Sequence, residues 1–303
     1  MIRKRRLPPG WYPESPEEIR AFLSQVEGNP PERGALAALA PHAGWYYSGS
    51  LAARAAAALR VPEGAGDPET VVVIGGHLPA GYPPLFIEEE GVETPLGDMP
   101  IDGEFRALLR KELGGRPDRY EDNTVEVQLP MVKFFFPRAK LLALRLPAEP
   151  GSFEAGRGIA QIGASLGRKL LVLGSTDLTH YGYNYDFYPR GLGKGALDWV
   201  KTVNDRAFIA GVIAGDPGEA LARAERDRSA CSAGAVLACL GYAEAAAGAG
   251  NKTDGKAGNK AGCRTELLAY GTSADVPGNK DNEVPDSFVG YAALAWYGIG
   301  KED

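Results

Sequence analysis

The sequence predicts an α/β fold with a largely parallel or mixed central sheet and helices on both of its faces. Two observations lead to this prediction. Four short apolar runs, each closely followed by Gly or Pro, are typical of buried strands, and they span 35–40, 71–74, 141–146 and 170–173. Helical stretches separate these runs, and strands that alternate with helices favour parallel pairing, because a parallel connection has to cross over the sheet.

The first element expected is a helix near the N-terminus. Ser15 can cap it, a proline follows in its first turn, and Glu18 can return the hydrogen bond. Ile19, Phe22 and Leu23 then recur at helical spacing. This spacing predicts that all three side chains face the core.

The remaining elements follow from the same patterns. Helices are expected at 51–59, 105–112, 125–136, 153–166, 196–214, 217–225 and 232–247. Two late strands, 266–270 and 288–296, are expected to complete the sheet. The run 248–262 contains mainly Gly, Asn, Lys and Ala, which predicts a mobile loop or insertion. Neither an internal repeat nor a clean linker stands out, so residues 1–303 are expected to form a single domain.

Composition excludes several classes of protein. The 303 residues are 44% hydrophobic and 24% charged, which is ordinary for a packed globular core, and the net charge of -6 disfavours nucleic-acid binding. The basic start lacks the apolar stretch of a secretory signal, and no apolar run reaches the roughly 18 residues of a membrane span. Three irregularly spaced cysteines fit a reducing compartment. We therefore expect a cytoplasmic protein that binds neither membranes nor nucleic acid.

All three histidines of the chain follow predicted strands. His42, His77 and His180 come after the first, second and fourth apolar runs. Because the carboxyl ends of parallel strands meet at one edge of a sheet, these strands would bring their histidines to a shared site. The alternative is that each imidazole only forms hydrogen bonds within a turn.

One cysteine stands in a context that favours a thiolate. Cys231 precedes the helix predicted from 232, where the positive end of the helix dipole lowers the pKa of a thiol. A thiolate is either a nucleophile or a metal ligand. The alternative is a small buried hydrophobic residue, an interpretation that suits Cys239, inside the helix, and Cys263, at a strand edge, better.

The segment 175–182 mixes reactive groups more densely than any other part of the chain, because it holds hydroxyls, a carboxylate, an imidazole and a phenol. Asp177 could orient a metal-bound histidine or tune His180 as a general acid or base. The alternative for Asp177 is a capping role in the turn that follows.

Two further local patterns leave alternatives open. The glycines at both ends of 44–49 predict a tight turn, in which Trp45 and Tyr46 either wall a pocket or pack against the core. Asn123 and Glu126 have the spacing of a helix capping box, although a place for Asn123 beside the site is the other interpretation.

Taken together, five segments resemble the Memo family, the AmmeMemoRadiSam system protein B type. They are Pro-His-Ala-Gly-Trp-Tyr-Tyr-Ser-Gly at 41–49, Glu-Val-Gln-Leu-Pro at 126–130, Ser-Thr-Asp-Leu-Thr-His-Tyr-Gly at 175–182, Ser-Ala-Cys at 229–231 and Val-Gly-Tyr-Ala-Ala at 289–293. The resemblance runs in order from Gly-Trp-Tyr-Pro at 10–13 to the last predicted strand, and so covers nearly the whole chain.

The resemblance implies a single Memo-like domain related to the class III extradiol dioxygenases. It also implies one divalent metal ion, iron first and copper or zinc as alternatives, held by His42, His77 and Cys231. Asp177 and His180 match a family segment that lines the same cavity, and these are the expected catalytic residues.

The chain departs from the family pattern at three places. Asn123 stands where the family usually has a histidine, which puts the proton-transfer role of that histidine in doubt here. Gly75 and Gly76 replace a more frequent Gly-Pro pair before His77. Ser232 replaces a glycine that commonly follows the cysteine.

Three functions are compatible with these residues. The first is a metal-dependent oxidoreductase, in which two imidazoles and a thiolate leave open positions on the metal ion. The second is a non-catalytic module that binds a metal, a small molecule, a peptide or a protein partner in the same pocket. The third is a metal-free hydrolase in which Cys231 is the nucleophile, His180 the base and Asp177 the residue that orients it.

Overall fold

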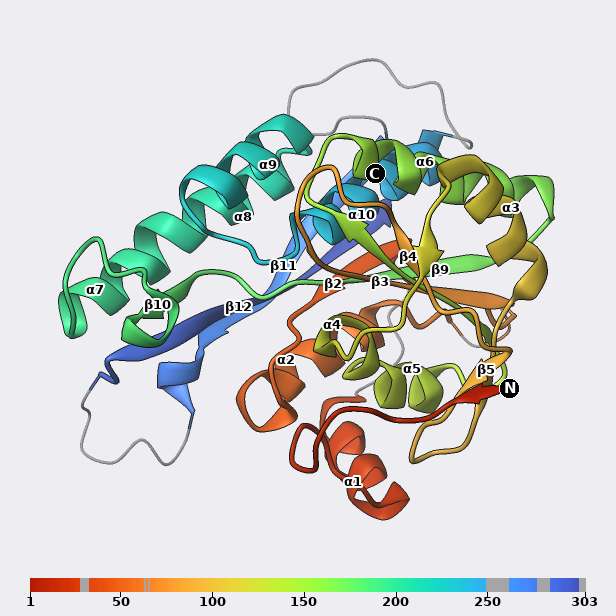
Figure 1. The fold of residues 1–303 in the computed structure, drawn as a ribbon, viewed down its shortest axis with the longest axis horizontal. Helices are drawn as coiled ribbons and strands as arrows, with labels where there is room; N and C mark the ends of the chain where they lie inside the picture. The colour runs from red at the N-terminus through yellow and green to blue at the C-terminus, as the bar shows by residue number, and fades with distance from the viewer. Residues whose placement is uncertain (28–32, 63, 65, 249–261, 277–283, 300–303) are drawn as a thin grey trace.

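A twisted mixed sheet crosses the centre of the computed structural model, which describes residues 1–27, 33–62, 64, 66–248, 262–276 and 284–299 (Figure 1). Its centre consists of four parallel strands in the order β2 (Ala37–Ala40), β9 (Leu170–Ser175), β3 (Thr70–Leu78) and β8 (Lys140–Pro147). The last three predicted apolar runs lie within β3, β8 and β9, and the first, 35–40, overlaps β2 from Ala37 onward. Each strand in this order pairs in parallel with the next, so the carboxyl ends of β2, β9 and β3 lie side by side.

Shorter or antiparallel strands extend the sheet on both sides. Across the described residues it has nine strands, and β12 (Ser287–Gly298) pairs with β2 in the antiparallel direction. The remaining members are β11 (Cys263–Thr272), β10 (His180–Gly182), β4 (Leu85–Phe86) and β7 (Arg116–Pro117). A separate three-stranded sheet contains β1 (Ile2–Arg3), β5 (Gly91–Val92) and β6 (Met99–Pro100).

Helices cover both faces of the central sheet, and Figure 1 shows one helical layer above the sheet and the other below it. One layer contains α3 (Gly103–Leu113), α6 (Gly151–Ser165), α8 (Asp205–Ile213), α9 (Pro217–Arg226) and α10 (Ala233–Gly248). The other contains α1 (Pro16–Glu27), α2 (Trp45–Ala58), α4 (Asn123–Glu126) and α5 (Leu129–Phe135). Within β3, Val72 packs into the first layer, whereas Val71 and Val73 pack into the second, because successive side chains of a strand point to opposite faces.

The predicted fold class is therefore confirmed as a single-domain α/β fold built on a mixed sheet. The start of α1 is also confirmed: the Ser15 hydroxyl accepts a hydrogen bond from the Glu18 N–H at 3.2 Å, and Ile19 and Leu23 are fully buried. Phe22 is half-buried and packs against the Trp45 ring at 5.1 Å between centroids.

Several predicted boundaries need correction. No tight turn precedes α2, because the helix already begins at Trp45 and includes most of the segment 44–49. The helix expected at 125–136 is two helices, since α4 ends at Glu126 and α5 begins at Leu129 with Pro130 in its first turn. The helix expected at 196–214 is interrupted by a π-helical turn, Val200–Asn204, between α7 (Lys194–Trp199) and α8.

The predicted capping box at 123–126 is wrong. Asp122, one residue earlier, caps α4 by accepting a hydrogen bond from the Thr124 N–H at 2.9 Å. Glu126 instead accepts hydrogen bonds from the backbone N–H groups of Arg6 and Leu7 and so fixes the N-terminal segment. Its side chain has a tertiary partner that a local motif does not reveal.

The loop expected at 248–262 lies, apart from its two end residues, outside the described residues. Within the part of the chain that the structure describes, no helix has both the length and the apolar character needed to cross a membrane.

Candidate metal centre

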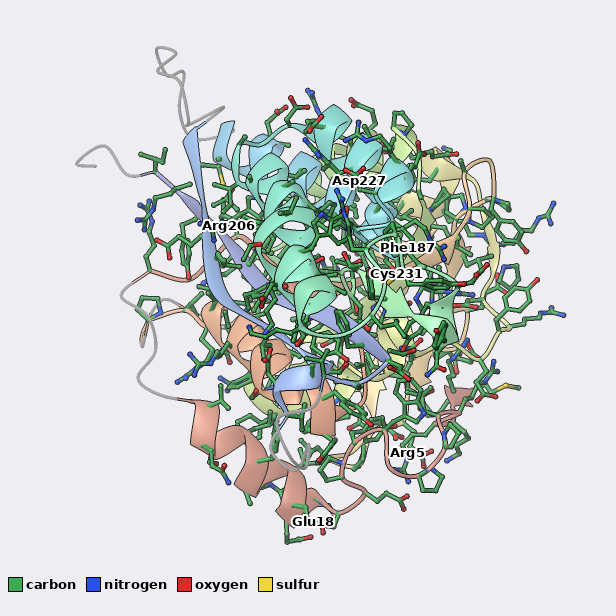
Figure 2. All side chains as sticks on the ribbon, turned by 90° about the vertical axis from the view of Figure 1, so that its left-hand side faces the viewer. Arg5, Glu18, Phe187, Arg206, Asp227 and Cys231 are labelled. Atoms are coloured by element: carbon green, nitrogen blue, oxygen red, sulfur yellow. The ribbon has the colours of Figure 1, made fainter. Side chains whose placement is uncertain are left out.

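His42, His77 and Cys231 converge at the carboxyl edge of the central strands. His42 follows β2 by two residues, His77 is the penultimate residue of β3, and Cys231 precedes α10 by two residues. One ligand atom from each of the three lies within 4.8 Å of the others, and the His42 Nε2 to Cys231 Sγ distance is 3.2 Å. Figure 2 labels Cys231 in a view from the side of α7 and β10. The strand-end argument therefore predicted the shared site correctly for His42 and His77.

Both imidazoles have a hydrogen-bond acceptor at Nδ1. With its proton on that nitrogen, His42 donates to the Ser175 hydroxyl at 3.1 Å, and His77 donates to the Asp122 carboxylate at 3.1 Å. Such partners fix the tautomer of a histidine and leave Nε2 without a proton for a metal ion. Two imidazole nitrogens and a thiolate sulfur are ligands that suit zinc, copper and iron. The residues present therefore fit a metal ion.

The carboxylate behind His77 is itself held by a buried cation. Arg145 forms an ion pair with Asp122 at 2.9 Å and another with Asp118 at 3.0 Å, and only 4% of Arg145 is exposed. Burial favours the neutral acid, but hydrogen bonds from His77 and Thr124 and the charge of Arg145 hold the pKa of Asp122 well below its usual value. A charged partner for His77 is thus built into the fold.

The backbone before His77 passes very close to its neighbours. A Cβ atom on Gly75 would lie 2.2 Å from the Thr124 hydroxyl oxygen, and one on Gly76 would lie 2.4 Å from the side chain of Ser232. His77 itself has a φ of 59°, a left-handed conformation that costs a non-glycine residue roughly 1–3 kcal/mol. The surrounding contacts hold this conformation, which presents the His77 ring to Cys231 and His42.

The site favours a thiolate in the absence of metal. Burial opposes ionisation of Cys231, but the neighbouring His42 and His77 lower its pKa well below the usual value. Burial likewise disfavours the charged form of His77, yet Asp122 and Cys231 raise its pKa to about 10. The pKa of His42 is raised too, by Cys231 and Asp177 against the effect of burial. Cys231 therefore favours positive charge beside it, and a divalent metal ion would supply that charge in place of imidazole protons.

The other two cysteines behave as buried hydrophobic residues, as expected. Burial raises the pKa of Cys239 to about 12 and that of Cys263 to about 11. Both belong to the core between the sheet and the α6–α10 layer. Neither thiol lies in the group formed by the three candidate ligands.

Asp177 contacts two of the three candidate ligands. Its carboxylate accepts a hydrogen bond from the His42 backbone N–H at 2.7 Å, and its other oxygen lies 3.9 Å from His42 Nε2. Its carbonyl oxygen accepts a hydrogen bond from the Cys231 N–H at 3.2 Å. Asp177 thereby links the end of β9 to the segment that precedes α10.

His180 lies farther along the same segment. Its Nδ1–H donates to the carbonyl oxygen of Leu178 at 3.1 Å, and its ring contacts Tyr185 edge-on at 4.8 Å between centroids. Asp177 and His180 both line a cavity of about 480 Å³. Asn123 also lines it and donates a hydrogen bond from its amide to the His42 carbonyl oxygen at 2.8 Å, which confirms the interpretation of Asn123 as a residue beside the site.

Comparison with known proteins assigns the family. A family model described as "Memo-like protein" matches residues 3–295. The chain belongs to the Memo-like family.

Archaeal members of this family resemble the chain along nearly all of its length. A MEMO1 family protein of Pyrococcus abyssi is 30% identical over 311 aligned residues, which cover 97% of this chain and 99% of that protein. A MEMO1 family protein of Archaeoglobus fulgidus is 26% identical, with 97% and 99% covered. Among solved structures, an uncharacterized protein of Escherichia coli K12 matches with a TM-score of 0.43 and 12% identity, covering 78% of this chain and 87% of that one.

Sequence reasoning missed several residues that position the ligands of this Memo-like site. Asp122 and Ser175 hold the two imidazoles, and Gln128 donates hydrogen bonds to Ser175 and to the carbonyl oxygen of Pro41. One signal was visible: Arg145 is a lone cation in the apolar run 141–146, and a buried cation needs a buried carboxylate. Ser175 and Gln128 gave no such signal, because their partners come from distant segments.

The aromatic residues at the start of α2 divide between two roles. Trp45 is buried, and its indole N–H donates to the carbonyl oxygen of Val127 at 3.1 Å, so the packing interpretation is confirmed. Tyr46 is 64% exposed. Neither residue lines the cavity beside the cluster; Tyr47 and Trp11 line it instead.

Proposed function

We propose that this protein is a metal-dependent oxidoreductase whose divalent metal ion is held by His42, His77 and Cys231. The observation that carries the proposal is the convergence of three ligand atoms within 4.8 Å, with an acceptor at Nδ1 of each imidazole. Three protein ligands leave coordination positions open for a substrate or O₂. Iron is proposed first, by the analogy to class III extradiol dioxygenases, with copper and zinc as alternatives.

The chain supplies defined tasks around such a metal. Asp177 would fix the backbone on both sides of the site. Its carboxylate accepts a hydrogen bond from the His42 N–H, and its carbonyl oxygen accepts one from the Cys231 N–H. His180 would hold or release a proton at Nε2, since its Nδ1–H is engaged by a carbonyl oxygen and its ring lines the cavity. A bound iron or copper ion would supply redox chemistry.

Metal content and oxygen uptake test the proposal in separate steps. Protein purified without an affinity tag is analysed for metal, then reconstituted anaerobically with Fe(II) and assayed for O₂ consumption with a panel of catechols. His42→Ala and His77→Ala are expected to stay folded by circular dichroism and to lose the metal. Full metal content in both variants would contradict the site. Lack of O₂ consumption by the iron-loaded protein would contradict the dioxygenase-like activity alone.

A non-catalytic binding module is the second candidate, and the cavity of about 480 Å³ beside the cluster favours it, because that volume suits a small ligand or a peptide side chain. Ligand binding without turnover by the metal-loaded protein would support it.

The hydrolase hypothesis has weaker support. The imidazoles beside the Cys231 sulfur are those of His42, at 3.2 Å, and His77, whereas His180 donates to the carbonyl oxygen of Leu178. Hydrolytic activity that persists in the presence of a chelator would support the hydrolase hypothesis.

A further inference from the structure

A buried carboxylate lies behind the cavity that His180 lines. Asp205 is the first residue of α8, and it is fully buried. Its carboxylate accepts hydrogen bonds from the N–H of Thr179 at 3.2 Å, from the hydroxyl of Thr179, and from the hydroxyl of Tyr270 at 2.8 Å. All three donors are uncharged groups. Burial raises the pKa of Asp205 to about 6, although these hydrogen bonds oppose the rise.

The backbone in front of Asp205 is also irregular. The π-helical turn, Val200–Asn204, ends directly before it, and such turns are rare and found frequently at functional sites. Asn204, the last residue of the turn, donates a hydrogen bond to the Thr179 hydroxyl at 2.9 Å. Burial of a carboxylate among uncharged donors costs free energy that an apolar side chain would not cost. Both unusual features are therefore directed at a single residue, Thr179.

Asp205 supports two walls of the cavity at once. Thr179 is fully buried, whereas the next residue, His180, lines the cavity. On the other wall, a Cβ atom on Gly290 would lie 2.0 Å from an Asp205 carboxylate oxygen, and the residue after it, Tyr291, lines the same cavity. The Gly290 N–H donates to the Thr179 carbonyl oxygen at 2.9 Å, so the two walls are joined at this point.

We propose that Asp205 is a positioning residue, which sets the place of the His180 ring in the cavity by fixing Thr179 from behind. Asp205 is not part of the described lining of the cavity, so it acts through Thr179 and not by contact with a ligand. The inference rests on the proposed function, in which His180 holds or releases a proton at Nε2. Proton transfer needs the imidazole within hydrogen-bond distance of its partner, and a fixed ring meets that need.

NMR of the metal-free protein tests the position of the ring. The chain has three histidines, so the ring signals of each can be followed, and His180→Ala assigns those of His180. This ring lies edge-on to Tyr185 at 4.8 Å, so its protons carry a chemical-shift contribution from that aromatic ring. Tyr185→Leu gives the shift without this contribution. We expect Asp205→Asn to move the His180 signal toward the Tyr185→Leu value, because an amide N–H₂ replaces one acceptor oxygen.

Asp102→Asn is the matched control. Asp102 is buried as well, and it accepts hydrogen bonds from the hydroxyl of Thr70 at 2.7 Å and from the N–H of Phe105 at 3.2 Å. Thr70 begins β3, so this carboxylate lies at the opposite edge of the sheet from the metal cluster. Both variants should lower the Tm, but only Asp205→Asn should move the His180 signal. A lowered Tm with an unmoved His180 signal in Asp205→Asn would overturn the proposal.

Variants of the donors keep the test decisive if Asp205→Asn folds poorly. Thr179→Val keeps the shape of the side chain but removes the hydroxyl, whereas Thr179→Ser retains the hydroxyl. We expect the His180 signal to move in Thr179→Val and to keep its wild-type position in Thr179→Ser. Tyr270→Phe also removes one hydrogen bond from Asp205, but on the side of β11, and should leave the signal in place. A signal that moves equally in all three variants, or in none, would overturn the proposal.

A metal titration of the wild type keeps this inference apart from the proposed function. The NMR measurement contains no metal, so a moved His180 signal in Asp205→Asn supports the positioning role even if the wild type binds no metal. That pair of results would contradict only the metal site. Metal binding by the wild type, with an unmoved signal in both Asp205→Asn and Thr179→Val, would contradict only the positioning role.

Discussion

Replacing Cys231 by serine is the sharpest test of the three-ligand site. The substitution nearly preserves size, but it exchanges a group that ionises near neutral pH for a hydroxyl that does not. In the structure the sulfur lies 3.2 Å from His42 Nε2, and it also lowers the energy of the protonated form of His77. The variant therefore loses one metal ligand and the negative charge that raises the pKa of both imidazoles.

The two losses affect metal binding in different ways. Cys231 is the anionic member of the three ligands. Its removal is expected to weaken metal affinity at neutral pH by about 100-fold or more, or about 3 kcal/mol. The pH dependence follows from the protons that metal must displace. His77 has a pKa raised to about 10, and only neutral imidazole binds metal.

Wild-type affinity should therefore rise with pH up to that value, by about tenfold per pH unit for each proton displaced. In Cys231→Ser the imidazoles lose the thiolate that raises their pKa, so proton competition ends at lower pH and the rise flattens earlier.

Metal titrations across about pH 6 to about pH 9 check both effects. Zn²⁺ serves as a probe without redox chemistry in calorimetry, and Co²⁺ reports thiolate coordination through its charge-transfer absorption. Cys239→Ser and Cys263→Ser are matched controls, because both thiols are buried in the core away from the three ligands. Thermal unfolding confirms that each variant is folded at the assay temperature. Wild-type affinity and pH dependence in Cys231→Ser would refute the His-His-Cys site.

The remaining predictions concern residues around the ligands. Asp122→Asn should weaken metal affinity by roughly 10- to 100-fold while the fold persists, because His77 loses its charged acceptor; an unchanged Kd in the same titration would contradict this. Asp177→Asn and His180→Ala should each reduce activity or metal affinity by a similar factor, and both variants should still bind metal. Complete loss of metal from either variant would indicate that the replaced residue is itself a ligand. Gly76→Ala should lower the Tm and the metal content together, because its Cβ would lie 2.4 Å from Ser232; a scanning calorimetry trace that matches the wild type would argue against that close approach.

Much of the fold was visible in the sequence because it depends on local patterns. The four apolar runs predicted β2, β9, β3 and β8, and the spacing of apolar residues predicted most helices to within a few residues. Errors arose where a tertiary contact decides a boundary. At the start of α2 the Trp45 N–H donates to the carbonyl oxygen of the distant Trp11. At α4, Asp122 and Asn123 are both favoured cap types, so residue type alone could not choose between them.

The ligands themselves were also within reach of the sequence. Position in the chain brought His42 and His77 together with His180, and it left Cys231 open between a thiolate and a buried hydrophobic residue; the resemblance to the Memo family then selected the three ligands. The sequence could not show that β9 lies between β2 and β3, which brings Ser175 beside the His42 ring. Strand order depends on how the crossovers pack, and that is a property of the whole core.

What the sequence determined by itself is the fold class, the family and the three candidate ligands, because each depends on residue types at short spacing or on motifs in order. The tertiary structure alone decided which groups orient and charge those ligands. The contacts from Arg145 through Asp122 to His77, and the walls of the cavity of about 480 Å³, join segments that are far apart in the sequence. Their contacts are long-range and directional, whereas local patterns report only which face of an element is apolar.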